Sequence, residues 1–376
     1  GWLGFLMPNQ PMGDVYRVYE PWARAAVEGG GIMGITESWV YPQLALVPMI
    51  LTLAFTPFVS YTVGWAILVT ALDALAFGML VGRGRSTGRT SAAWFWLAFI
   101  ALLGPVGLYR LDGLTVPLVI AGCLWLVGRP WAAAMILGAA VIAVRRRGAV
   151  IGGAAVVSAL VLVALLAAGA GAHAFGFIGE QATRGLQVEA PIAAPYLWGA
   201  LLGVPGFSVY YSFDIITFQV TGTDIDVTIA LMTPVLVLAM LALTALGAWK
   251  AARGVRFVSL FPSLSLALVL GFIVFNKVGS PQYLVWLVPS LVVGLVVRRT
   301  AWFAPATLAL AAALLTQLVY PILYEGILVP HPIAVVILTL RNLLLVALLA
   351  WTVVRVARLT PPARRSVSVP TIASPV

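Results

Sequence analysis

The residues able to do chemistry gather in a few polar stretches of an apolar chain. The stretch NQPMGDVYRVYEPWARAA begins at Asn9 and places one carboxylate, Asp14, among tyrosines and arginines. A second polar stretch, 173–226, holds Arg184, Gln187 and Glu189. A carboxylate can take a proton from an attacking hydroxyl, and basic groups stabilise a phosphate anion. These residue types therefore suit proton transfer and anion binding.

Several other chemistries find no support in the sequence. The only cysteine, Cys123, lies inside an apolar run and has no partner for a disulfide or a zinc site. With only two histidines, His173 and His331, a histidine metal site is not expected either. A Gly-rich phosphate loop followed by Lys-Ser or Lys-Thr is missing, which argues against an ATP-driven pump. We therefore expect neither a metal nor another cofactor.

The elements that must position these residues are apolar runs long enough to cross a bilayer. The 376-residue chain is 62% hydrophobic and 9% charged, and runs of about 20 apolar residues are typical of membrane-spanning helices. We predict an all-α, polytopic membrane domain over 1–359. Its nine complete spans are placed at 61–82, 91–108, 113–128, 149–172, 227–248, 257–276, 283–297, 301–320 and 333–354.

The distribution of charge orients these spans. Eleven of the 12 acids fall in the loops of one side, and the exception, Asp73, lies within a span. Because basic connectors mark the cytoplasmic side of a membrane protein, the acids are placed outside. The net charge of +10 then reflects topology and predicts no nucleic-acid partner. Sixteen of the 22 basic residues fall on the cytoplasmic side: Arg83, Arg85, Arg89, Arg129, Arg145, Arg146, Arg147, Lys250, Arg253, Arg256, Arg298, Arg299, Arg355, Arg358, Arg364 and Arg365.

Four segments do not fit as complete spans. We predict that 43–58 is a half-buried helix on the outer face, broken by Pro48 and Pro57. The run 131–144 would reach only about 21 Å as a helix, so it is expected to lie along or dip into the inner leaflet. GWLGFL at 1–6 is too short to cross and is interpreted as the end of a truncated first helix. Residues 360–376 are expected to form a disordered cytoplasmic tail.

Five motifs, in this order along the chain, together resemble a known family. They are MGDVYRVYEPWARAAVEGG, WVYPQLALVP, RGLQVEAPIAAPYLW, FNKVGSPQYLVWLVP and LRNLLL. They resemble the signatures of glycosyltransferase family 87, bacterial membrane mannosyltransferases of the GT-C architecture that use a polyprenyl-phosphate sugar as donor. The resemblance extends over most of the chain, and KVGSPQYLVWLVP and the acid of the first outer loop are its most specific parts.

The resemblance implies a site on the outer face. Asp14 would be the single catalytic base, and the transfer would invert a β-linked phosphosugar into an α-mannoside. We expect Lys277, Arg341 and Arg184 to bind the donor phosphate, taking the electrostatic role that a metal has in other enzymes. The residues expected to bind the sugar or the acceptor are Tyr16, Tyr19, Gln187, Glu189, Gln282 and His331.

The expected activity is that of a hexosyltransferase in the bacterial plasma membrane, with its active site on the extracytoplasmic face. It would transfer mannose from polyprenyl-phosphate-mannose to a lipid-anchored or cell-envelope glycan. Two alternatives stay open. One is a transferase of the same fold that uses another polyprenyl-phosphate sugar, such as arabinose or glucose. The other is a transporter or flippase for a lipid-linked intermediate.

Structural roles are open for the same residues. Asp14 could pair with Arg17 or cap the helix that follows, and Lys277 could extend to the lipid headgroups. An aromatic belt at the membrane interface could account for most of the aromatic residues that could also stack on sugar rings: Tyr16, Tyr19, Trp22, Trp39, Tyr41, Trp198, Tyr210 and Tyr211.

Charged residues near or within the spans also have structural interpretations. Arg341 could be satisfied by Asp112, by Glu189 or by backbone carbonyl groups. Arg110 and Asp112, in the sequence YRLDG, are expected to form a local ion pair. Asp73 has no helical neighbour of opposite charge, so we expect it to be neutral or hydrogen-bonded to another helix.

Overall fold

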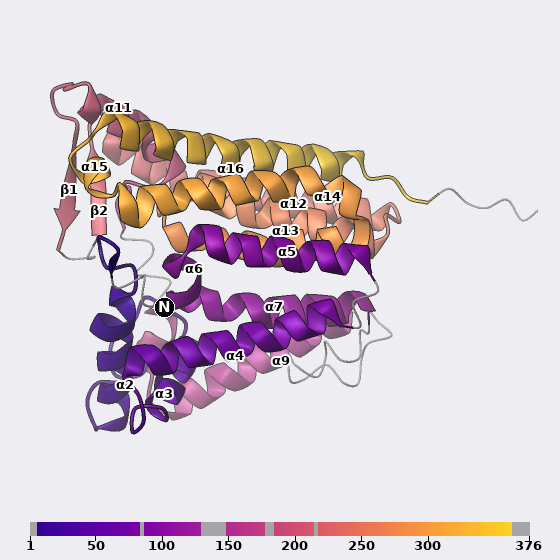
Figure 1. Ribbon diagram of the computed structural model, residues 1–376, viewed down its shortest axis with the longest axis horizontal. Coiled ribbons are helices and arrows are strands. Elements are labelled where there is room, and N and C mark those ends of the chain that lie inside the picture. Colours follow the sequence, from indigo (N-terminus) through magenta and orange to yellow (C-terminus); the bar gives the residue numbers. More distant parts are fainter. Residues whose placement is uncertain (1–5, 83–85, 129–147, 177–183, 214–216, 363–376) are drawn as a thin grey trace, which may run out of the picture.

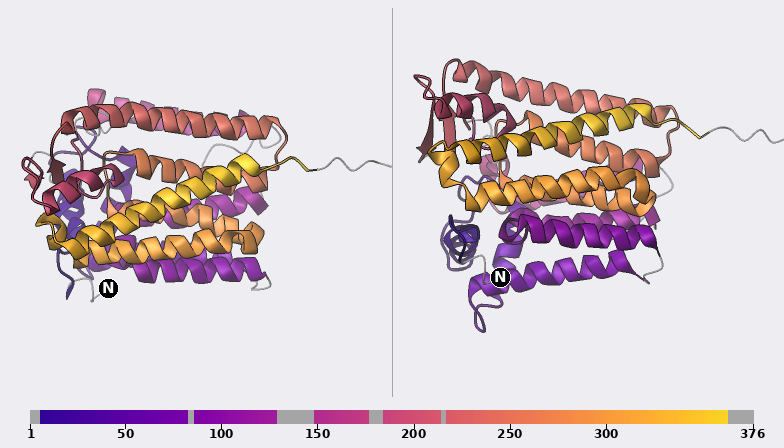
Figure 2. Two further views of the ribbon diagram at one scale, coloured as in Figure 1. Left: turned by 90° about the horizontal axis from the view of Figure 1, so that it is seen from above. Right: turned by 45° about the horizontal axis from the view of Figure 1, so that its top comes forward.

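The computed structural model describes residues 6–82, 86–128, 148–176, 184–213 and 217–362. Long helices run side by side in every view (Figures 1 and 2). Within the described ranges, five helical segments are long and apolar enough to cross a membrane, which confirms the helical fold class. They are Tyr61–Val81, Ile225–Ala252, Phe257–Phe275, Pro281–Ile322 and Pro332–Arg358.

The nine predicted spans overlap helices, with differences at their ends, but the number of nine membrane crossings stays a prediction. The prediction 91–108 is divided in two, because α5 ends at Leu103 and Gly104 has a positive φ of 64°. The prediction 149–172 ends too late, since the helix stops at Ala167, before Gly169 with its φ of 88°. The helices that correspond to predicted spans are α4 (Tyr61–Val81), α5 (Thr87–Leu103), α7 (Leu111–Gly128), α9 (Gly148–Ala167), α12 (Ile225–Ala252), α13 (Phe257–Phe275), α14 (Leu287–Gln317) and α16 (Pro332–Arg358).

Helix α14 contains a reversal of the chain at the place predicted between two spans. Arg298 has non-helical backbone angles, with φ −147° and ψ 68°. A Cβ atom built on Gly294 would lie 2.1 Å from Cδ2 of Trp302, so the two halves fold back on each other. Glycine at this position lets the indole ring pack directly against the backbone of the first half.

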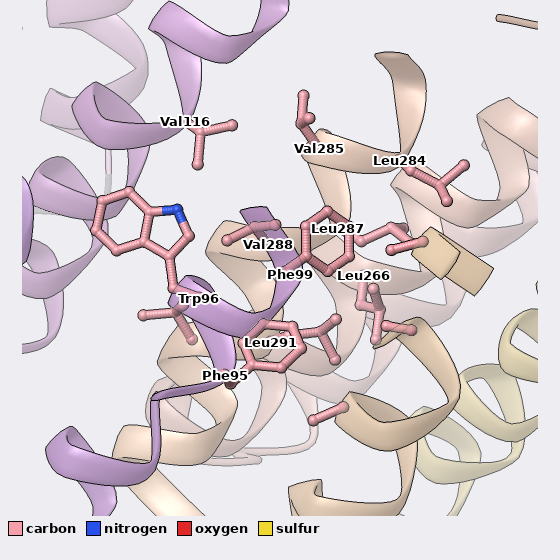
Figure 3. Close-up of a cluster of buried hydrophobic side chains, with 14 of the residues drawn as sticks. Phe95, Trp96, Phe99, Val116, Leu266, Leu284, Val285, Leu287, Val288 and Leu291 are labelled. Carbon is pink, nitrogen blue, oxygen red and sulfur yellow. The ribbon is translucent and has the colours of Figure 1, made fainter. Parts of the chain in front are cut away.

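A large apolar core packs α4, α5 and α7 against α13, α14 and α16, and Figure 3 shows part of it. Phe95, Trp96 and Phe99 of α5 contribute buried rings, and Leu287 and Leu291 of α14 lie in the same cluster. Close approach of α5 and α14 needs Gly88, where a Cβ would lie 2.8 Å from the carbonyl oxygen of Val296. Small residues at such crossings allow helices to pack tightly in apolar surroundings.

The short elements gather at one end of the bundle, called the loop end below (Figure 1). They are the π-helix η1 (Val15–Tyr19), α2 (Glu20–Val27), α3 (Leu46–Leu53), α6 (Pro105–Tyr109), α11 (Ala194–Leu201), α15 (Glu325–Leu328) and a β-hairpin. The last turn of α16 lies at the opposite end, where Lys250 donates a hydrogen bond to the carbonyl oxygen of Leu359 at 2.9 Å. Arg355 also lies there, with its guanidinium carbon 4.8 Å from the ring centroid of Trp302.

The prediction for 43–58 is partly wrong. Residues Leu46–Leu53 form α3, with Leu46, Met49 and Thr52 buried. Pro48 lies in the first turn of this helix, where its missing N–H has no intrahelical partner to lose, so it does not break the helix. Thr52 donates a hydrogen bond to the carbonyl oxygen of Pro48 at 2.8 Å.

A β-hairpin departs from the all-α prediction. Strand β1 (Ser208–Ser212) pairs antiparallel with β2 (Thr217–Thr221). The chain segment before α11 extends this pairing, because Val220 donates a backbone hydrogen bond to Leu186 at 3.0 Å and Val188 donates one to Phe218 at 3.2 Å. The predicted inner-leaflet segment 131–144, the stub up to residue 5 and the tail from residue 363 lie outside the described residues.

Candidate functional site

Asp14 and Arg110 form an ion pair at the loop end. Asp14 immediately precedes η1, but its side chain does not cap that helix. Arg110 lies in extended conformation between α6 and α7, and its side chain is 14% exposed against 29% for Asp14. Asp14 therefore pairs with neither Arg17 nor a helix end, and the predicted local pair of Arg110 with Asp112 is wrong.

Tyr320 connects this pair to a third part of the chain. Its hydroxyl accepts a hydrogen bond from Nη2 of Arg110 at 3.2 Å and donates one to the carbonyl oxygen of Asn9 at 3.1 Å. The Asn9 amide in turn donates to the carbonyl oxygen of Pro321 at 2.9 Å. The first polar segment, the α6–α7 turn and the π-helix η6 (Leu318–Ile322), which follows α14, are thereby held together beside Asp14.

Asp112 lies in the first turn of α7 and binds a different partner. Nε1 of Trp286 donates a hydrogen bond to its Oδ1 at 2.8 Å. Gln282 lies near the same carboxylate, and its own Oε1 accepts a hydrogen bond from Ser280 at 2.6 Å. A carboxylate in the first helical turn is also favoured by the helix dipole. The structure thus brings Gln282, a predicted ligand-binding residue, next to Asp112, which was expected to pair with Arg110 instead.

Glu189 and Arg341 form a second ion pair, which is more deeply buried. Nη2 of Arg341 lies 3.4 Å from Oε2 of Glu189 and 3.2 Å from its carbonyl oxygen. The side chains are 4% and 1% exposed. Arg341 is therefore satisfied in part by Glu189 and its backbone, one of the alternatives left open by the sequence. Its Nε is buried without a hydrogen-bond partner, so the guanidinium retains a donor for a further ligand.

Burial also changes the pKa of Glu189, the acid of this pair. Loss of hydration raises the pKa of Glu189 to about 7, and the positive charges of Arg341 and Arg110 act in the opposite direction. The influence of Arg110 indicates that the two ion pairs belong to one electrostatic cluster. Glu189 is thus a carboxyl group able to exchange its proton near neutral pH.

Lys277 belongs to a segment packed against the one that carries Glu189. Its carbonyl oxygen accepts a backbone hydrogen bond from Gln187 at 3.0 Å. Two residues later, a Cβ on Gly279 would lie 2.3 Å from the backbone nitrogen of Ala190, so only glycine fits. Lys277 is 7% exposed, and burial lowers its pKa. The tight approach brings three of the predicted residues, Lys277, Gln187 and Glu189, into one region.

Arg184 lies close to a group of tyrosines. Its Nε is buried without a hydrogen-bond partner, and its charge acts on Tyr41 and Tyr283. Burial, the larger effect, raises the pKa of Tyr41 to about 12. Asp112 acts on the same two tyrosines. Arg184 and Asp112 thus influence the same two tyrosines with opposite charge.

The remaining predicted ligand-binding residues occupy varied positions. Tyr19 is 1% exposed, its ring lies 5.0 Å from Trp65, and its hydroxyl accepts a hydrogen bond from the backbone of Leu111. This places it in the packed core and not on an open surface. Tyr16 donates a hydrogen bond to Gln10 at 2.9 Å near the surface. His331 is exposed and immediately precedes α16.

Asp73 lies apart from this cluster, within α4. It lines a small cavity with Trp96, Phe99, Val116 and Val285. Across the described ranges of the chain, His, Cys, Asp and Glu form no group of three that could hold a metal ion.

No known protein family, curated protein or solved structure matches the chain.

The loop end therefore combines three acids with several basic groups. Asp14 and Glu189 are each paired with an arginine, whereas Asp112 binds an indole N–H. Sequence reasoning identified Asp14, Lys277, Arg341 and Glu189 but missed Arg110 as the partner of the proposed base. The only signal for Arg110 was its position in a short polar turn between two predicted spans.

Proposed function

We propose that the protein is a membrane-embedded hexosyltransferase that transfers mannose from polyprenyl-phosphate-mannose to a lipid-linked or cell-envelope glycan. The transfer would take place on the extracytoplasmic face of the bacterial plasma membrane. The motif resemblance to glycosyltransferase family 87 supports the choice of donor and sugar. The five apolar helices support a membrane location.

The observation that carries this proposal is the ion pair of Asp14 with Arg110 at the loop end, where Arg110 also acts electrostatically on Glu189, the partner of the buried Arg341. The ion pair with Arg110 holds the Asp14 carboxylate in position, and a positioned carboxylate can act as a general base. Arg341 offers a guanidinium 1% exposed with an unpartnered Nε. A cation this deep in an apolar helix is costly without an anion, and Glu189 provides one contact while leaving that donor for another.

The reaction needs one base and an anion-binding site. Asp14 removes the proton from an acceptor hydroxyl, whose oxygen attacks the anomeric carbon of the donor. The bond from that carbon to the phosphate oxygen breaks, and its electron pair leaves with polyprenyl phosphate. A phosphate monoester has a second pKa of about 6, so it leaves without being protonated. Attack opposite the leaving group inverts the anomeric configuration, and the arginines and Lys277 stabilise the charge on the phosphate.

The direct test is Asp14→Asn in membranes supplied with polyprenyl-phosphate-mannose. Removal of a general base lowers the rate by roughly 10²- to 10⁴-fold, measured as radiolabelled mannose transferred to glycan. The matched control is Glu28→Gln, an exposed acid of the same segment that lies 3.7 Å from Arg24; it should retain wild-type activity. Near wild-type transfer by Asp14→Asn would rule out this base.

The same assay separates the alternative functions. A wild-type protein that moves a lipid-linked sugar across the membrane but never forms a glycosidic bond would be a transporter. Transfer from a polyprenyl-phosphate arabinose or glucose donor, with none from the mannose donor, would keep the enzyme class and change the sugar. Both donors are therefore tested in parallel with polyprenyl-phosphate-mannose.

A further inference from the structure

Five aromatic rings form a continuous row at the loop end. The ring centroids of Phe213 and Tyr211 are 5.0 Å apart, and those of Tyr211 and Phe218 are 4.9 Å apart. Phe218 lies 5.9 Å from Tyr324, which lies 5.0 Å from Tyr320. Every step is within the range of direct contact between aromatic rings. The row thus connects the β-hairpin with the π-helix η6, which follows α14.

The outer part of the row is a consequence of strand register. Tyr211 pairs directly with Phe218 across the hairpin, so their side chains share one face. The next pair, Tyr210 with Gln219, points to the other face, where the Tyr210 hydroxyl donates a hydrogen bond to Gln219 at 2.8 Å. Tyr211 therefore belongs to the row, whereas its neighbour Tyr210 does not.

The inner end of the row reaches the proposed base. The guanidinium carbon of Arg110 lies 5.9 Å from the ring centroid of Tyr320, and Arg110 pairs with Asp14. Exposure falls along the row, from 84% at Phe213 to 36% at Tyr211 and 9% at Tyr320. The row therefore starts at an open surface and ends beside the group that would accept the proton.

We propose that this row is a binding track for the glycan chain of the acceptor. The proposal rests on the proposed transferase function and adds where the acceptor sugars lie. Sugar rings carry apolar C–H faces that stack on aromatic rings, while their hydroxyl groups stay hydrated or bind tyrosine hydroxyls. The terminal sugar would lie nearest Arg110 and Asp14, and preceding sugars would extend toward Tyr211 and Phe213.

The course of the row distinguishes this role from membrane anchoring. Aromatic anchors spread around a protein at one depth, level with the lipid headgroups. This row instead leads inward from the surface and ends at a charged pair. An extended oligosaccharide fits both ends of the row. Its outer sugars need only contacts with aromatic rings, and its terminal sugar needs a base beside the attacking hydroxyl.

The chain offers closely matched control residues. Tyr210 neighbours Tyr211 on the same strand and is 44% exposed, but it lies on the other face. Phe58 is 86% exposed, like Phe213 at 84%, and lies in the loop after α3. The test variants are Tyr211→Ala and Phe213→Ala, and the controls are Tyr210→Ala and Phe58→Ala. Because all four side chains are at least partly exposed, their removal should leave the fold intact, which thermal unfolding checks.

Binding is measured first without any donor, on purified wild type and the four variants. The probes are α-linked mannotetraose and methyl α-mannoside, and the readout is saturation-transfer difference NMR. Loss of one or two ring contacts should weaken mannotetraose binding by roughly tenfold in the test variants. Methyl α-mannoside binding and the controls should stay unchanged. Equal losses in test and control variants, or no loss in the test variants, would overturn the track.

Turnover and membrane association are measured second. With polyprenyl-phosphate-mannose as donor, the test variants should raise KM for a tetramannoside acceptor and leave kcat and the KM of a monomannoside unchanged. Lower liposome flotation of Phe213→Ala, with unchanged mannotetraose binding, would identify a membrane anchor and overturn the proposal. Wild type that binds mannotetraose but never transfers mannose would refute the proposed function and leave the binding track standing.

Discussion

Asp14 of the first polar segment pairs with Arg110 at the start of α7, and the same guanidinium donates to the hydroxyl of Tyr320. Three segments distant in sequence thus meet at one guanidinium. The pair is partly shielded from solvent, with side chains 29% and 14% exposed.

Removing both partners of this pair should cost less than the sum of the two single removals. Arg110→Met leaves a partly buried carboxylate without its cation, which we expect to lower the free energy of unfolding by about 1–3 kcal/mol. The double variant Asp14→Asn/Arg110→Met should lose less than the sum of the single variants, because neither charge is then left alone. Denaturant unfolding in detergent micelles measures this cycle. Strict additivity would show that the two side chains do not interact.

Arg110 should also affect the rate. Arg110→Lys keeps a positive charge beside Asp14 and should retain more transfer activity than Arg110→Met, because a cation at this position can still hold the Asp14 carboxylate in place. Arg24→Met is the control, since Arg24 forms its ion pair with Glu20 on the surface of α2, at 2.8 Å. Initial rates of mannose transfer at saturating donor check this order. Equal activity of the lysine and methionine variants would exclude a role for the charge.

Glu189 should make stability depend on pH. Its pKa rises from 4.5 to about 7 on folding because burial disfavours the charged form. Between these values the folded state keeps a proton that the unfolded state releases, so the free energy of unfolding should fall as pH rises. The decrease is on the order of 3 kcal/mol across this window. Glu189→Gln should flatten the profile, whereas the exposed Glu37→Gln should not, as followed by thermal unfolding from pH 4.5 to 7.5.

Arg341 should determine affinity for the donor. Arg341→Lys keeps the charge but loses the planar set of donors that fits a phosphate, so we expect KM for the polyprenyl-phosphate sugar to rise roughly tenfold. The control is Arg355→Lys in the same helix, where Arg355 lies 4.8 Å from Trp302 at the opposite end of the bundle. Donor titrations at fixed acceptor compare the two variants. An unchanged KM in Arg341→Lys would remove Arg341 from the phosphate site.

Gly279 should be intolerant of any side chain. A methyl group there would lie 2.3 Å from the backbone nitrogen of Ala190, so Gly279→Ala should separate the Lys277 segment from the Glu189 segment and cost about 1–3 kcal/mol. In contrast, Gly122→Ala in α7 meets no atom within 4 Å and should be neutral or stabilising by up to about 1 kcal/mol. Thermal unfolding distinguishes them. Equal stability would show that the two segments do not approach so closely.

Much of the helical framework is predictable from the sequence. The start of α4 at Tyr61 and the start of α13 at Phe257 coincide with the predicted span starts, because an apolar run of given length and its polar flanks define a helix locally. The reversal at Arg298 also falls between two predicted spans. The sequence also shows that most acids lie in different connecting segments from most basic residues.

The sequence by itself determined where the long helices lie and which residues are available for acid–base and anion chemistry, but not the β-hairpin or the break at Gly104. Only the tertiary structure decided that Asp14 pairs with Arg110, that Asp112 binds Trp286, and that Glu189 lies against Arg341. Helix formation depends on neighbours within a few residues and on apolar length. The partner of a polar side chain depends instead on which helices pack together, and no local pattern in the chain specifies that choice.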